Sequence, residues 1–148
     1  MTVCARKGAA DLSSSSLATD LLAHLRQHVA AERFALLAYC FMPNHVHLAL
    51  EGLSEASDLR RLVSQWKQAT GYRYKQEHRQ GLWMPGYHDR VLRDGEPTMN
   101  VVLYALRNPV RAGLAGSLCE YPFAGSDVFG DEELREILGA GQKACCDR

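Results

Sequence analysis

A long apolar stretch between residues 34 and 50, interrupted once, constrains the fold of this chain more than any other part of its sequence. Residues 34–42 are almost all apolar, as in a central strand that is covered on both faces. The interruption is Pro43-Asn44, a pair typical of turns, and a proline cannot donate a hydrogen bond to a β-ladder. The stretch therefore predicts a β-hairpin whose second strand covers residues 45–51.

Two histidines lie in the second of these strands. Side chains alternate along a strand, so His45, His47 and Ala49 share one face. Two imidazoles at adjacent positions of one face can bind a single metal ion or a single phosphate, and a strand holds them rigidly. Histidines in a strand are also common as packed or surface residues, so the pair by itself leaves both interpretations about equally open. The opposite face, expected to face the core, carries Val46, Leu48 and Leu50.

A second distinctive run follows downstream, Tyr104-Ala-Leu-Arg-Asn-Pro-Val-Arg-Ala-Gly-Leu. Together with Met42-Pro-Asn-His-Val-His and the intervening Gly81-Leu-Trp, it resembles the single-tyrosine transposases of the HUH superfamily. The chain is most similar to the REP-associated tyrosine transposases, which combine a Met-Pro-Asn-His-hydrophobic-His run with a downstream tyrosine and Asn-Pro-Val-Arg-Ala-Gly. The resemblance covers roughly residues 2–129, and two motifs in the right order are far more specific than either alone.

The resemblance implies a transposase and endonuclease for single-stranded DNA with a hairpin, such as a repetitive palindromic element, working as a monomer or homodimer. It implies that Tyr104 is the nucleophile and forms a 5′-phosphotyrosine link. His45, His47 and Asn108 would bind the metal, Asn108 lying one helical turn after the tyrosine. Mg²⁺ or Mn²⁺ is the cofactor expected for this chemistry, whereas histidine ligands suit Zn²⁺ or Ni²⁺ better, which leaves the ion open.

Other side chains near these motifs have competing interpretations. Tyr104 is one of six tyrosines, and only its sequence context distinguishes it from a core residue. His88 is a candidate for an additional ligand or base and Asp89 for a residue that orients a histidine, although such residues at strand ends are more often surface groups. Trp66 has the spacing of a core residue, while Tyr72 and Tyr74 are candidates for base stacking.

Net charge is zero, but the charges are unevenly distributed. Residues 57–93 contain eight Lys/Arg and three Asp/Glu, whereas residues 114–148 contain three Lys/Arg and seven Asp/Glu. A basic middle fits a local phosphate-binding face, and a solvated helix face is the plainer alternative. The expected DNA-binding residues are Arg60, Arg61, Lys67, Arg73, Lys75, Arg107 and Arg111.

The remaining periodicities complete the expected topology. They predict helices at residues 17–31, 57–79 and 97–107, the last continuing past Pro109 toward Gly113, and strands at 2–6 and 87–92. This order indicates a ferredoxin-like α+β sandwich, a four-stranded antiparallel sheet with helices packed on one face. Residues 1–130 are expected to form the transposase domain, with a first strand that looks clipped beside the family. Residues 131–148 are expected to form an acidic helix and tail.

Composition narrows the location of the protein. No apolar run is long enough to span a membrane, and no signal peptide is visible. Five cysteines without a Cys-x-x-Cys pair, one of them in the expected core strand at Cys40, favour reduced thiols. The sequence therefore predicts a cytoplasmic protein.

Three other functions remain open on the sequence. A transposase-derived protein that binds hairpin DNA without cutting it would keep the fold, but it would need neither the histidines nor Tyr104. A metal-dependent hydrolase would use water as its nucleophile and Tyr104 only for structure. A ferredoxin-like RNA-binding protein lacks support, because the strands show no aromatic-rich signature.

Overall fold

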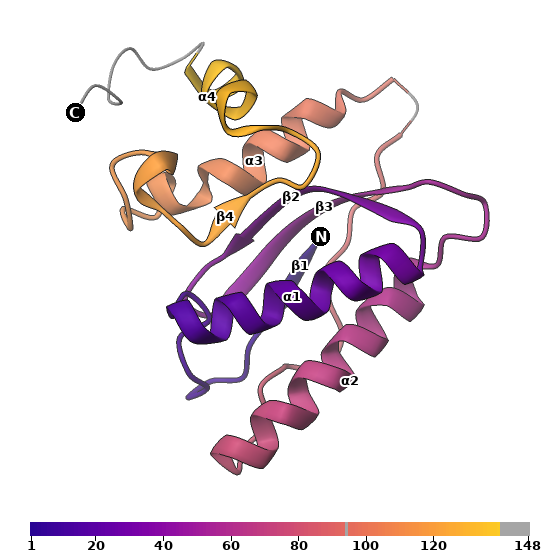
Figure 1. Cartoon of the computed structure of the whole chain (residues 1–148), viewed down its shortest axis with the longest axis vertical. Helices are drawn as coiled ribbons and strands as arrows, with labels where there is room; N and C mark the ends of the chain where they lie inside the picture. Colours follow the sequence, from indigo (N-terminus) through magenta and orange to yellow (C-terminus); the bar gives the residue numbers. More distant parts are fainter. Residues whose placement is uncertain (94, 140–148) are drawn as a thin grey trace.

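The computed structural model describes residues 1–93 and 95–139 and contains a four-stranded antiparallel sheet with the order β1-β3-β2-β4 (Figure 1). The strands are β1 (Thr2–Cys4), β2 (Phe34–Phe41), β3 (His45–Gly52) and β4 (Ala124–Gly125). The described helices are α1 (Ser15–Ala31), α2 (Leu59–His78), α3 (Thr98–Arg111), α4 (Asp131–Gly139) and the short 3-10 turn η1 (Leu118–Glu120). This sheet and the mixed α+β class confirm the fold class predicted from the sequence.

Strands β2 and β3 form the predicted hairpin. Its pairs run from Phe34 opposite Gly52 to Phe41 opposite Val46. The register shifts once, because pairing passes directly from Leu36 to Ala38 and leaves one extra residue, a β-bulge. On the other side of β3, Thr2 of β1 lies opposite His47.

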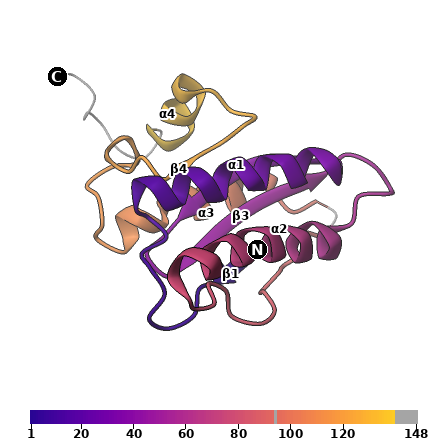
Figure 2. The same cartoon turned by 60° about the horizontal axis from the view of Figure 1, so that its bottom comes forward.

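Helices α1 and α2 lie side by side over one face of the sheet (Figure 2). The alternate residues of the hairpin that were expected to face the core do so, since Val46 and Leu48 are almost fully buried here. Trp66 of α2 is fully buried as predicted, and its indole nitrogen donates a hydrogen bond to the Leu21 carbonyl oxygen at 3.0 Å. This face contains the main hydrophobic core, with Leu21, Leu25, Leu36, Phe41, Leu62 and Trp83 among its members.

Helix α3 packs on the opposite face, which corrects the expectation that the helices share one face. A second core joins Val102 and Leu106 of α3 to Ala38 and Ala49 of the sheet. The small alanine side chains leave room for a helix to approach the strands closely. Leu134 of α4 packs against the same core. The sheet is therefore covered on both sides, with the histidine face turned toward α3.

The segment predicted as a strand at residues 87–92 runs instead as an irregular edge beside β1. Thr2 and His88 exchange two backbone hydrogen bonds of 2.6 and 2.9 Å, and Met84 N–H donates to the Cys4 carbonyl at 2.9 Å. These contacts are isolated bridges, because β1 is only three residues long and Gly86 turns the chain with a φ of +72°. The fourth strand is β4, which pairs with β2 at the opposite edge.

Helix α3 continues through Pro109 to Arg111, as expected from its sequence. Pro109 has no backbone N–H to donate, but it lies in the last turn of α3, so few helical residues follow it. The chain then leaves the helix at Gly113, whose φ is +71°. Among the helices of residues 1–93 and 95–139, none has the length and apolar character that a membrane crossing requires.

Candidate active site

The imidazole rings of His45 and His47 meet on the α3 face of the sheet. Their Nε2 atoms are 2.9 Å apart, and the rings are nearly perpendicular, with centroids 4.6 Å apart. Both histidines begin β3, where pairing with β1 and β2 on either side fixes the backbone. The strand thus brings the predicted pair together with the reactive nitrogens facing each other.

Each histidine also has a partner at its other ring nitrogen. The Nδ1 atom of His45 is 2.6 Å from Oδ1 of Asn44, and Nδ1 of His47 is 3.1 Å from Oγ1 of Thr2. Neither Asn44 nor Thr2 was predicted to contact a histidine. Asn44 is part of the Met-Pro-Asn-His motif and adjoins His45, so the motif could have indicated this contact. Thr2 is brought to His47 only by the register of the sheet.

The environment favours the neutral form of both imidazoles. Burial lowers the pKa of His45. Burial, the neighbouring His45 and the amino-terminal amine together lower the pKa of His47 to about 4. Neutral imidazoles keep a lone pair on one nitrogen, which is the form that binds a metal ion.

The geometry of the pair fits a shared divalent cation. Two ligand nitrogens about 2.1 Å from one ion and roughly 90–110° apart are separated by about 3.0–3.4 Å, close to the spacing in this structure. In the part of the chain that the structure describes, no group of three His, Cys, Asp or Glu side chains could hold a metal.

Tyr104 of α3 lies against His47. Its ring meets that of His47 edge to face, with centroids 5.8 Å apart. The guanidinium carbon of Arg111 lies 5.3 Å from the centroid of the Tyr104 ring. The tyrosine is 52% exposed, unlike the buried His47 below its ring. Helix packing thus brings the expected nucleophile to the expected metal ligand His47, which lies 57 positions earlier in the sequence.

Asn108, predicted as the third ligand, lies one turn after Tyr104. Its amide nitrogen donates a hydrogen bond of 2.6 Å to the Tyr104 carbonyl oxygen. That bond leaves Oδ1 as the Asn108 atom available to a metal ion. His88 pairs with Thr2 at the sheet edge and is exposed.

The basic residues of α2 fall into two groups. Lys67 is partly buried, and its Nζ donates hydrogen bonds of 2.6 Å to the carbonyl oxygens of Met84 and Gly86. Arg73 lies 3.3 Å from Asp20, and Arg61 lies 3.8 Å from Glu32, both across the α1–α2 contact. Lys67 is therefore tied to the fold, whereas Arg61 and Arg73 form these ion pairs at the surface, with side chains 61% and 53% exposed. The other predicted DNA-binding residues are also exposed: Arg60, Lys75, Arg107 and Arg111.

The two tyrosines of α2 differ in the same way. Tyr72 is 67% exposed and remains available for base stacking. Tyr74 is 2% exposed, and its hydroxyl accepts a hydrogen bond from the Ala10 N–H at 2.8 Å. Tyr74 is therefore a core residue, and its interpretation as a base-stacking platform is wrong.

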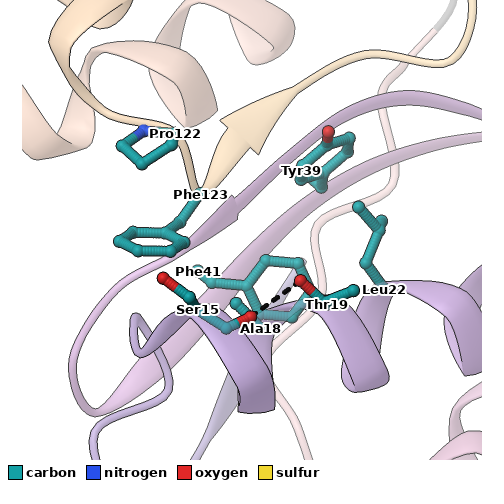
Figure 3. Close-up of a pocket in the computed structure, with 8 residues that line it drawn as sticks. All are labelled: Ser15, Ala18, Thr19, Leu22, Tyr39, Phe41, Pro122 and Phe123. Carbon is teal, nitrogen blue, oxygen red and sulfur yellow. Dashed lines mark hydrogen bonds between the residues drawn. The ribbon is translucent and has the colours of Figure 1, made fainter.

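A cavity of about 200 Å³ opens between α1, β2 and the segment before β4 (Figure 3). Its floor and walls are mainly apolar, and Thr19 donates its hydroxyl to the Ser15 carbonyl at the rim. Phe41 points into the cavity from the α1 face of the sheet, so the cavity and the histidine pair lie on opposite faces. The other residues around it are Ala18, Leu22, Tyr39, Pro122 and Phe123.

Comparison with known proteins places this arrangement in a family. No curated protein sequence matches the chain. The solved structure of a REP-associated tyrosine transposase bound to a REP hairpin is similar in fold, with a TM-score of 0.69 and 18% identity over 83% of this chain and 72% of that one. The family described as IS200-like transposases matches residues 2–102, a span that includes both histidines and ends just before Tyr104. Since that match covers more than half of the sequence, the chain belongs to the IS200-like transposase family.

Proposed function

We propose that this protein is a metal-dependent DNA transposase that cleaves and rejoins single-stranded DNA at hairpin-flanked sites through a 5′-phosphotyrosine intermediate on Tyr104. The observation that carries the proposal is the contact between the Tyr104 ring and His47, whose Nε2 lies 2.9 Å from that of His45. A structural role alone would require neither an exposed tyrosine at this point nor two neutral imidazoles facing each other.

The two histidines and Oδ1 of Asn108 would hold a divalent cation, with Mg²⁺ or Mn²⁺ as the expected ion. When bound, this ion supplies Lewis-acid stabilisation of the charge that develops on the phosphodiester oxygens. The strand fixes the imidazoles, and Thr2 and Asn44 orient them through their second nitrogens.

Tyr104 carries out the covalent step. Its hydroxyl loses a proton to solvent or a base and attacks the phosphorus, so that an Oη–P bond forms while the P–O3′ bond breaks. The leaving 3′ oxygen takes up a proton. A different 3′-hydroxyl can then attack the phosphotyrosine and restore the tyrosine, which rejoins strands without an external energy source.

The DNA strand would be held by exposed cations around the site. Arg107 and Arg111 flank Asn108 on α3, next to the nucleophile, and Arg60 and Lys75 lie exposed on α2. The hairpin partner is supported by family membership and by the hairpin-bound structure that shares this fold. Tyr72 on α2 offers a ring for stacking an unpaired base.

The test incubates labelled single-stranded DNA hairpins with the full chain and Mg²⁺ or Mn²⁺, and measures protein–DNA adducts that survive denaturation. We expect an adduct with the wild type and none with Tyr104→Phe or His45→Ala. Tyr72→Phe is the matched control, because it removes an exposed tyrosine hydroxyl from a different helix.

Two outcomes would contradict the proposal. Cleavage without an adduct, retained by Tyr104→Phe, would identify a hydrolase that uses water. Hairpin binding with neither adduct nor cleavage, under both ions, would identify a binding protein derived from a transposase.

A further inference from the structure

We propose that the Thr2 hydroxyl is a reversible hydrogen-bond partner of His47, which lets the histidine pair be fully hydrogen-bonded both without and with a bound divalent cation. Thr2 would be a positioning residue, because it acts on the cation only through His47. For the state with a bound cation, the inference rests on the metal site of the proposed function. For the state without a cation, it rests only on the hydrogen bonds of this structure.

Three contacts link four side chains in a row. They run from Asn44 Oδ1 to His45 Nδ1 (2.6 Å), from His45 Nε2 to His47 Nε2 (2.9 Å), and from His47 Nδ1 to Thr2 Oγ1 (3.1 Å). An amide oxygen only accepts, so His45 carries its proton on Nδ1 and its Nε2 accepts. His47 must then donate from Nε2, and its Nδ1 accepts the Thr2 hydroxyl proton. Every contact of the row is satisfied in this one direction.

A shared cation requires a different proton arrangement. Both Nε2 lone pairs must then point at the ion, which His45 already satisfies. His47 must carry its proton on Nδ1 instead, and that N–H needs an acceptor. A hydroxyl serves both states, because it donates or accepts after a rotation about its C–O bond. The proton leaves Nε2 and another is taken up at Nδ1 from solvent, so the net charge of the pair does not change.

The backbone holds the Thr2 side chain in place for this task. Thr2 lies opposite His47 in the sheet, and its other edge is fixed by two backbone hydrogen bonds to His88. The segment that carries His88 is in turn held by Lys67, through the carbonyl oxygens of Met84 and Gly86. Because His47 is only 8% exposed, water has little access to replace a missing partner at its Nδ1.

The experiment measures the tautomers directly, by ¹⁵N–¹H correlation spectra of the histidine rings in the full chain. Without metal we expect His45 protonated on Nδ1 and His47 on Nε2. Saturation with Zn²⁺, a diamagnetic ion that imidazoles bind well, should move the His47 proton to Nδ1 and leave His45 unchanged.

Substitutions at Thr2 provide the second arm. Thr2→Val keeps the shape of the side chain without its hydroxyl, and we expect Zn²⁺ affinity by calorimetry to fall about 10- to 100-fold. Thr2→Ser should restore affinity to within about 3-fold of the wild type. Thr19→Val, which removes an exposed hydroxyl on α1, is the control and should bind as the wild type does.

The outcomes separate this inference from the proposed function. Two results would overturn only the role of Thr2 and leave the metal site untouched. They are a His47 ring protonated on Nδ1 without metal, and a Thr2→Val variant that binds Zn²⁺ as tightly as the wild type does. Zn²⁺ bound without tautomer exchange would do the same. Failure of Zn²⁺ to reach the histidines would overturn both this inference and the metal site, whereas a Tyr104 adduct test addresses only the covalent chemistry.

Discussion

At the scale of single residues, His47 combines constraints that are usually found apart. It is buried, it faces a second imidazole, and the amino-terminal amine lies near enough to disfavour its protonated form. The same side chain also touches the ring of Tyr104. The protonation state of His47 should therefore affect both the stability of the sheet and the ability of the site to bind a metal ion.

The lowered pKa of His47 predicts acid sensitivity. Unfolded histidine titrates near pH 6.5, whereas folded His47 titrates at about 4, so between these values the unfolded chain binds a proton that the folded chain does not. Stability should fall as pH falls from 6.5 to 4, by about 3 kcal/mol from this residue. Urea unfolding at a series of pH values checks this, with His47→Gln as comparison. Parallel pH profiles of the two proteins would contradict it.

The sequence predicted the two histidines of the hydrogen-bond row but not their partners Asn44 and Thr2. His45 and His47 were predicted to share a face, because strand alternation depends only on their spacing. Asn44 adjoins them, but its residue type alone suggested a turn rather than a partner for a histidine. Thr2 could not be found, since no local pattern encodes which residue of β1 lies opposite His47.

At the scale of elements, the approach of α3 to the sheet determines where Tyr104 lies. Ala38 and Ala49 pair across β2 and β3, and both are buried beneath α3. Side chains this small bring the helix close to the strands. Larger ones would lift it, and the nucleophile with it.

Ala49→Leu tests this dependence. Overpacking should destabilise the fold by about 1–3 kcal/mol and reduce the yield of Tyr104 adduct more than that loss of stability explains. Ala23→Leu, at an exposed position of α1, is the matched control and should change neither quantity appreciably. Urea unfolding and the adduct assay provide the two measurements. A normal adduct yield in Ala49→Leu would show that α3 can shift without consequence for the site.

Two lysines of α2 should differ in what they contribute. Lys67→Met keeps the apolar stem but loses two charged hydrogen bonds to the 84–86 turn, so we expect destabilisation of about 1–2 kcal/mol. Lys75→Met, at an exposed position, should leave stability within about 0.5 kcal/mol of the wild type and weaken DNA binding, most clearly at low salt. Unfolding curves and filter binding measure both. Equal loss of stability in the two variants would argue against the separate roles.

Elements were predicted unevenly, for physical reasons. Long amphipathic or apolar segments were found close to their observed bounds: the hairpin, α1, α2 and α3. The fourth strand was misplaced because β4 has only two residues and no apolar alternation, while residues 87–92 have a strand-like pattern but only a short edge to pair with. Sequence periodicity predicts elements whose own residues alternate between buried and exposed positions. It does not predict short strands that form only because a neighbouring strand has an unpaired edge.

At the scale of the whole molecule, contacts distant in sequence hold the sheet together on the side where β2 pairs with the edge strand β4. Arg26 of α1 forms a two-pronged ion pair with Asp127, and the Tyr121 hydroxyl donates to the Phe41 carbonyl at 2.7 Å. These contacts attach the segment after α3 to the part of the chain that the family match covers. The segments that precede and follow α3 in the sequence are thereby attached to each other.

The overall charge pattern was predicted only in part, because sequence does not show which charges are already paired. Arg61 and Arg73 face acidic residues of neighbouring elements, and Lys67 is used inside the fold. Arg61 and Arg73 stay exposed, but their charges are partly offset by these carboxylates, and the exposed arginines of α3 adjoin the nucleophile. The predicted DNA-binding face is thus better defined by its position than by its total charge.

The bulge in β2 means that this strand is one residue longer than its pairing requires. Leu37 is the surplus residue, and without it Ala38 and Cys40 would keep their partners Ala49 and His47. The length of the strand is thus independent of the alignment that fixes the histidines. In the evolution of such a sheet, loss of one residue at this point would leave the pairing of the later residues with the histidine strand in place, whereas the same change beyond the bulge would set every following side chain against a new neighbour.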